Sequence, residues 1–189
     1  MAMTAAPSCR GYLLSGVAAY LNPEQHHRLM QLSSPELRGF LGKPDAQRDD
    51  WVPIDWTIEA LILADRVAGA GDLKLCWPIG AFVAAREAGV VQTLALKVLR
   101  PPIIMSLASG LWVTHYRNAG RVVARGRSDR EMIVSFMDVP NPRRAFCLSI
   151  GGWIEGFLRL GPRRNIDVRH TACLSQGGTT CEFLVTWDE

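Results

Sequence analysis

The chain has 189 residues, a formal net charge of +3, 48% hydrophobic residues and 21% charged residues. These values are typical of a soluble globular protein that is long enough to bury a core. The small basic excess argues against nucleic-acid binding, and no apolar run reaches the roughly eighteen residues of a membrane span. The first ten residues also lack the apolar stretch of a signal peptide. We therefore expect a cytoplasmic protein in which a flexible segment, residues 1–10, precedes a single domain, residues 11–189.

The first half of this domain is predicted to be helical. Residues 11–50 form an expected helical extension, in which 11–21 are a short helix or strand and Pro23 opens a helix through residue 32, because proline suits the first helical turn. The predicted core, residues 51–187, begins with W-V-P-I-D-W, where Asp55 is a suitable N-cap. Prolines at 101 and 102 begin a further helix that runs to about Tyr116.

The second half alternates between strands and a helix. Residues 121–127 and 131–139 alternate in hydrophobicity and predict a first hairpin. A long helix beginning at Pro142 carries Cys147, and a second hairpin turns at 176–179, where two glycines allow positive φ. The predicted fold is α+β: an N-terminal helical half, then a four-stranded antiparallel sheet with a long helix between two hairpins. The helices are expected to pack against one face of the sheet.

Four residues in the last third form a candidate metal site: Cys147, His170, Cys173 and Cys181. Zinc takes four such sulfur and nitrogen ligands in a tetrahedron, and a site with all four positions filled is structural rather than catalytic. The glycine turn brings Cys173 and Cys181 close together. His170 and Cys173 would point to opposite faces of a regular strand, so the site requires a bulge or a strand end between them.

Other roles for the cysteines compete with zinc. A free cysteine often packs as a small hydrophobic residue. Cys173 and Cys181 would form a cross-strand disulfide if the chain were exported, although a reducing compartment favours metal binding. Cys9 is expected to be a free thiol on a mobile end, and Cys76 a filler of the core.

The candidate metal ligands resemble the zinc site of the vinyl-reductase-type (4-vinyl reductase) ligand-binding domain, the sensor of phenol- and xylene-responsive transcription activators. That pattern has a Cys on a helix, a Glu three residues before a second Cys, and a third Cys eight residues later. This sequence departs from it at His170, which stands where those sensors have Glu. The resemblance spans roughly residues 51–187 and implies small hydrophobic or aromatic effectors.

A second resemblance involves the helical half. With W-V-P-I-D-W near its start, this half is similar to an uncharacterised bacterial family related to haem/nitric-oxide-binding proteins. This likeness suggests His115 as an axial haem ligand. The haem-binding relatives use a Tyr-x-Ser-x-Arg motif for the propionates, and the sequence lacks it, so haem is the weaker alternative.

The sequence contains no nucleophile or metal-hydrolase motif such as Gly-x-Ser-x-Gly or His-Glu-x-x-His, so we expect a protein without enzymatic activity. The main hypothesis is a sensor or regulatory module that binds a small hydrophobic molecule and is stabilised by structural zinc. A structural or dimerisation scaffold without ligand is the alternative, and either protein is expected to form a homodimer or act through a downstream partner. The aromatic residues that would line the pocket also suit a plain core: Trp77, Phe82, Trp112, Tyr116, Phe136 and Trp153.

Overall fold

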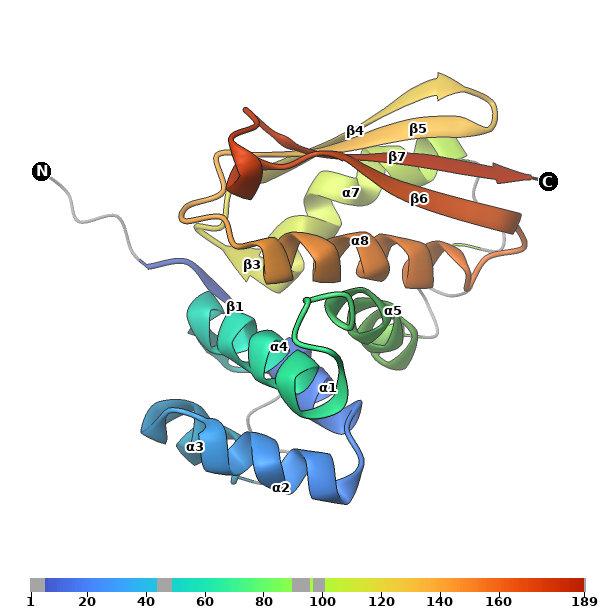
Figure 1. Ribbon diagram of the computed structural model, residues 1–189. Helices are drawn as coiled ribbons and strands as arrows, with labels where there is room; N and C mark the ends of the chain where they lie inside the picture. The colour runs from blue at the N-terminus through green and yellow to red at the C-terminus, as the bar shows by residue number, and fades with distance from the viewer. Residues whose placement is uncertain (1–5, 44–48, 90–95, 97–100, 189) are drawn as a thin grey trace, which may run out of the picture.

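The computed structural model describes residues 6–43, 49–89, 96 and 101–188. A four-stranded sheet forms one layer, and helices cover one of its faces and extend away from it (Figure 1). The helices are α1 (Gly11–Ala19), α2 (Pro23–Leu32), α3 (Pro35–Leu41), α4 (Ile54–Ala68), α5 (Cys76–Glu87), α7 (Pro101–His115) and α8 (Arg144–Leu158). The strands are β1 (Ser8–Arg10), β2 (Trp51–Pro53), β3 (Tyr116–Arg117), β4 (Arg121–Ser128), β5 (Glu131–Met137), β6 (Arg164–Ala172) and β7 (Cys181–Asp188).

The large sheet has the strand order β4-β5-β7-β6, and every neighbouring pair is antiparallel. Burial alternates along β5 and β7, because successive side chains of a strand point to opposite faces. Phe136 pairs with Cys181 and Val134 with Phe183, so these side chains share the face that meets the helices. Helix α8 connects the two hairpins. The predicted α+β class and the order of hairpin, helix and hairpin are therefore confirmed.

A second, three-stranded sheet has the order β2-β1-β3. Strand β1 lies between two strands that are distant in sequence, and Cys9 at its centre is fully buried beside the Thr57 hydroxyl. The prediction of a mobile thiol at Cys9 is therefore wrong, and the predicted flexible segment 1–10 contains a strand. Three residues are too few for a hydrophobic period to reveal such a strand.

The helix starts follow ordinary capping chemistry in part. Asn22 and Gln25 form a capping box ahead of α2, with Pro23 in the first turn. Ser34 caps α3, a helix that the sequence analysis did not predict. Asp55 lies in the first turn of α4 rather than at its N-cap, so its carboxylate meets the positive end of the helix dipole without capping it.

Helices α5 and α8 approach each other closely. A Cβ atom at Gly152 would lie 1.9 Å from the carbonyl oxygen of Trp77, and one at Gly80 would lie 1.9 Å from that of Ser149. Glycine is needed at both positions because the two backbones leave no room for a side chain.

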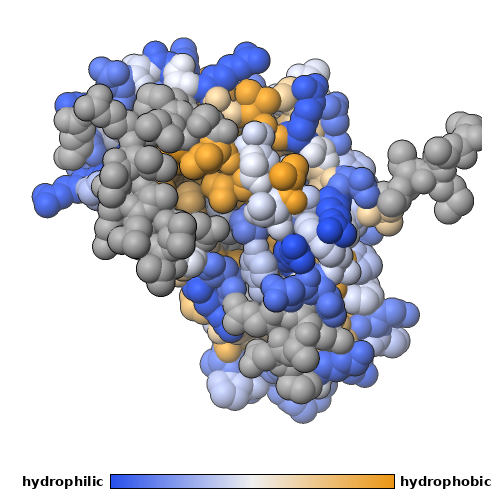
Figure 2. Space-filling view, turned by 180° about the vertical axis from the view of Figure 1, so that it is seen from behind, coloured by the Kyte–Doolittle hydropathy of each residue, from blue (hydrophilic) through white to orange (hydrophobic). Residues whose placement is uncertain are grey.

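Apolar side chains gather in the upper part of the face shown in Figure 2. Leu107 and Val113 on α7 are 46% and 65% exposed. Within the described ranges, no helix combines the length and hydropathy needed to cross a lipid bilayer.

Candidate functional site

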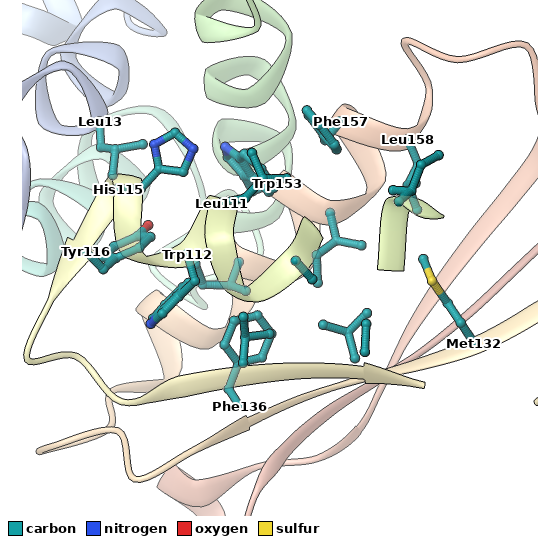
Figure 3. A pocket seen from close by; sticks show the side chains of 17 residues that line it. Leu13, Leu111, Trp112, His115, Tyr116, Met132, Phe136, Trp153, Phe157 and Leu158 are labelled. Atoms are coloured by element: carbon teal, nitrogen blue, oxygen red, sulfur yellow. The ribbon is translucent and has the colours of Figure 1, made fainter. Parts of the chain in front are cut away.

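A cavity of about 80 Å³ lies between the large sheet and the helices (Figure 3). Helices α7 and α8 form two of its walls, strands β4 and β5 form the third, and α1 contributes Leu13. Almost all of the lining side chains are apolar. They are Leu13, Ile104, Ala108, Leu111, Trp112, His115, Tyr116, Val122, Ala124, Met132, Val134, Phe136, Ile150, Trp153, Ile154, Phe157 and Leu158.

The polar groups concentrate at one end of the cavity, where α7 passes into β3. Figure 3 shows the His115 ring and the Tyr116 hydroxyl on the same side, with Met132 and Leu158 at the opposite end. Nδ1 of His115 is hydrogen-bonded to the hydroxyl of Tyr12 on α1. Nε2 of the same ring is buried and has no hydrogen-bonding partner in the part of the chain that the structure describes. The cavity is thus amphipathic, with one polar end and a long apolar remainder.

His115 is a neutral imidazole at physiological pH. Burial, together with the positive charge of Arg10, lowers its pKa from 6.5 to about 4. The partner hydroxyl of Tyr12 stays protonated, because burial and the negative charge of Glu87 raise its pKa to about 12. Both groups at this end of the site are therefore uncharged.

The six aromatic residues predicted to line a pocket fall into two groups. Trp112, Tyr116, Phe136 and Trp153 line the cavity, and the rings of Trp112 and Tyr116 are stacked 4.0 Å apart. Trp77 lies elsewhere, where its indole N–H donates to Glu155 on α8. Phe82 is 37% exposed and packs against Tyr20. Leu13 could not be predicted as a lining residue, because only the tertiary fold brings α1 to the cavity.

The three predicted cysteine ligands lie where the N-terminal turn of α8 meets the β6–β7 connection. One ligand atom from each of Cys147, Cys173 and Cys181 lies within 4.8 Å of the others. The Sγ atoms of Cys147 and Cys181 are 3.2 Å apart, and the backbone N–H of Leu174 donates to Cys181 at 3.3 Å. A shift in register between His170 and Ala172 supplies the bulge that the sequence required. His170 is not one of these three, although its side chain contacts Cys181, and its ring is stacked on Phe183.

The pKa values of the Cys147 and Cys181 thiols are shifted in opposite directions. Hydrogen bonding from Cys147 lowers the pKa of Cys181 to about 4, and contacts with His170 and the Leu174 N–H act in the same direction. The contact with Cys181, followed by burial, raises the pKa of Cys147 well above its usual value. A negative charge on one sulfur opposes a charge on its neighbour, so the pair holds one thiolate at most. These contacts connect the β6–β7 turn to α8.

Comparison with solved structures identifies the fold. An H-NOX protein from S. oneidensis in the Fe(II)NO state aligns with 95% of this chain and 99% of its own, at 14% identity and a TM-score of 0.60. The Fe(II) unliganded H-NOX protein from K. algicida aligns with 95% and 97%, at 11% identity and a TM-score of 0.66. An oxygen-binding H-NOX domain related to soluble guanylate cyclases aligns with 95% and 93%, at 9% identity and a TM-score of 0.64. No family model matches the sequence, and comparison with curated proteins gives no significant match.

The chain therefore has the fold of H-NOX domains. The resemblance to haem/nitric-oxide-binding proteins is supported at the level of the fold, whereas the vinyl-reductase resemblance receives no support from these comparisons. The predicted zinc cofactor is wrong, because the solved proteins with this fold are described with Fe(II), and their family with haem. The cysteine set also offers three ligand atoms, whereas a closed zinc site takes four.

Haem does not fit the described cavity. One feature favours haem: the His115 imidazole is neutral and its Nε2 is unpartnered among the described residues, so this nitrogen could serve as an axial ligand. The cavity of about 80 Å³ is nevertheless far below the roughly 300–1,000 Å³ of ordinary ligand pockets. Trp112, Phe136 and Trp153 occupy its walls, and none of the described lining residues is a Lys or Arg that would pair with propionates.

The unusual pKa of His115 predicts a pH-dependent stability. Between pH 6.5 and about 4 the unfolded state takes up a proton at this residue and the folded state does not, so stability is lost as the pH falls through this window. We expect a loss of about 3 kcal/mol in the free energy of unfolding from this residue. Denaturant unfolding at several pH values should show this part of the pH dependence disappear in His115→Phe. It should persist in His27→Gln, which alters an exposed histidine; equal profiles for wild type and His115→Phe would contradict the assignment.

Proposed function

We propose that this protein is a non-catalytic sensor or regulatory module whose site is the cavity between α7, α8 and the large sheet. The observation that carries the proposal is an almost entirely apolar cavity between helices and sheet of an H-NOX fold. Empty apolar cavities bind small apolar molecules, as an engineered cavity of about 150 Å³ does with benzene or xenon. The smaller volume here favours a compact ligand. The signal would pass to a partner protein or through a homodimer.

The position of the cavity supports a sensing role. Its walls come from α1, α7, α8 and the sheet, so an occupant would contact elements from both halves of the chain. His115 connects the cavity to α1 through Tyr12, and the next residues form β3 of the small sheet. A ligand that binds one arrangement of these elements better than another shifts their equilibrium.

A haem-based gas sensor is the second candidate, because the related solved structures are described with Fe(II), nitric oxide and oxygen. The unpartnered Nε2 of His115 favours it as well. Its weakness is the small cavity, which would have to open before a macrocycle could enter.

The test uses 1-chlorobutane as a compact apolar probe and compares two leucine substitutions on one strand. Ala124 lines the cavity, whereas Arg125 beside it is exposed, because adjacent strand residues point to opposite faces. We expect the probe to raise the melting temperature of wild type and of Arg125→Leu saturably, since binding to the folded state alone is stabilising. Ala124→Leu fills the cavity and should abolish the shift. An equal response of all three proteins, or none in wild type, would contradict the proposed site.

The same proteins distinguish the haem candidate. When hemin is added to the apoprotein, we expect no Soret band that depends on His115, so the spectra of wild type and His115→Phe should be the same. A stoichiometric band that His115→Phe abolishes would instead establish the second candidate and overturn the first.

A further inference from the structure

One polar atom at the polar end of the cavity has no hydrogen-bonding partner among the residues that the structure describes. It is the buried Nε2 of His115, a residue that lines the cavity. An unsatisfied buried donor or acceptor costs about 1–3 kcal/mol, so such a group in a folded protein indicates a function or a bound molecule. The indole N–H of Trp112, on the same wall, is already satisfied, because it donates to the Gly120 carbonyl at 3.1 Å.

The chemistry of His115 restricts which groups can hydrogen-bond to Nε2. The ring is neutral, and its Nδ1 is engaged with Tyr12, so Nε2 is either a single donor or a single acceptor, depending on the tautomer. A hydroxyl group is both a donor and an acceptor and satisfies either tautomer. The Tyr116 hydroxyl lies at the same end of the cavity and has the same dual character (Figure 3).

Charge excludes other ligand classes. The positive charge of Arg10 acts on His115 and would repel an ammonium group. A carboxylate would lose its hydration in a cavity whose described walls carry no cationic side chain, and burying an unpaired charge is costly. The ligand is therefore neutral. Its body is apolar, because the walls beyond His115 and Tyr116 are aliphatic and aromatic as far as Met132 and Leu158.

From these observations we infer that the ligand of this site is a short neutral alcohol, with its hydroxyl at His115 and Tyr116 and its hydrocarbon part extending toward Met132 and Leu158. This inference rests on the proposed function, since it names the ligand class of the same cavity. It adds that a single hydroxyl, and not shape alone, selects the ligand. A site built to hydrogen-bond a hydroxyl discriminates strongly against an analogue that lacks it.

The experiment compares 1-butanol with 1-chlorobutane, two probes of the same chain length that differ in one terminal group. Dissociation constants would be measured by NMR titration for wild type, His115→Phe and Tyr116→Phe, each first shown to be folded by its melting transition. Hydration differences between the probes cancel when the change caused by each substitution is compared, as in a double-mutant cycle. We expect each substitution to weaken 1-butanol about tenfold and to leave 1-chlorobutane within about twofold, since about 1.4 kcal/mol corresponds to tenfold. Butyrate and butylammonium should not bind.

The outcomes separate this inference from the proposed function. If 1-chlorobutane binds wild type and neither substitution weakens 1-butanol selectively, the hydroxyl assignment is overturned and the apolar site stands. If neither probe binds wild type, the proposed function fails together with the inference. Since Tyr116→Phe preserves the ring and removes only the hydroxyl, it remains a valid test should His115→Phe unfold.

Discussion

Replacing Gly152 by alanine is expected to lower the free energy of unfolding by at least about 3 kcal/mol, at the upper end of overpacking effects. The added Cβ would lie 1.9 Å from the carbonyl oxygen of Trp77 and 2.7 Å from its carbonyl carbon. Both neighbours are backbone atoms, so no side-chain rotation relieves the overlap. Helices α5 and α8 must instead move apart along the contact that also includes Gly80. Chemical denaturation of wild type and variant measures the difference.

Gly110 provides the matched control for this substitution. It lies within α7, and a Cβ there would meet no described atom within 4 Å apart from its chain neighbours and the nearby backbone of its own helix. Alanine at this position should raise stability by about 0.5–1 kcal/mol, because glycine is unfavourable within a helix. Equal effects of the two substitutions would show that helix propensity, and not the close approach of α5 and α8, determines the result.

The second large effect is expected at Asp65, whose side chain is 0% exposed on α4. Its two carboxylate oxygens accept the backbone N–H groups of Leu73 at 2.8 Å and Leu75 at 3.1 Å. These bonds hold the loop between α4 and α5, in which Leu73 has a positive φ of 68°. Asp65→Ala leaves both N–H groups unsatisfied and should lower the free energy of unfolding by about 3 kcal/mol.

Asp65→Asn separates hydrogen bonding from packing. It preserves the size of the side chain and one acceptor oxygen, and replaces the other oxygen by a donor that faces an N–H group. We expect Asp65→Asn to lower the free energy of unfolding by less than Asp65→Ala does. Hydrogen exchange at Leu73 and Leu75 should accelerate in both variants, and unchanged exchange would contradict this role for Asp65.

The same residue illustrates where sequence patterns fail. Asp65 lies at a helical spacing from Ile58, Leu61 and Ile62, so the pattern places it on the apolar face of α4. The pattern gives no reason for a carboxylate there. The reason is a loop eight to ten residues away that folds back onto the helix and brings its N–H groups to the carboxylate.

The candidate site shows the same division. Val122 and Ala124, and likewise Met132, Val134 and Phe136, are two residues apart, and this spacing is enough to predict one face of the first hairpin. All five side chains line the cavity. The spacing of cysteines likewise predicted that Cys147, Cys173 and Cys181 would meet, and their ligand atoms lie within 4.8 Å. Their proximity was predictable because a tight turn and an adjacent helix fix it locally. The identity of a cofactor was not, because cysteines at this spacing are compatible with packing as well as with metal.

By itself, the sequence determined the elements that depend on local periodicity and turn chemistry: α2 with its proline start, both hairpins, the helix between them and the inward face of the sheet. Only the tertiary structure decided how distant segments meet. It placed β1 between β2 and β3 and so buried Cys9. It also brought Tyr12 of α1 to His115 at the end of α7, which leaves a single imidazole nitrogen at the polar end of an apolar cavity. The physical reason is that a hydrophobic period specifies which face of an element is buried, whereas the partner of that face is fixed by packing among all the elements.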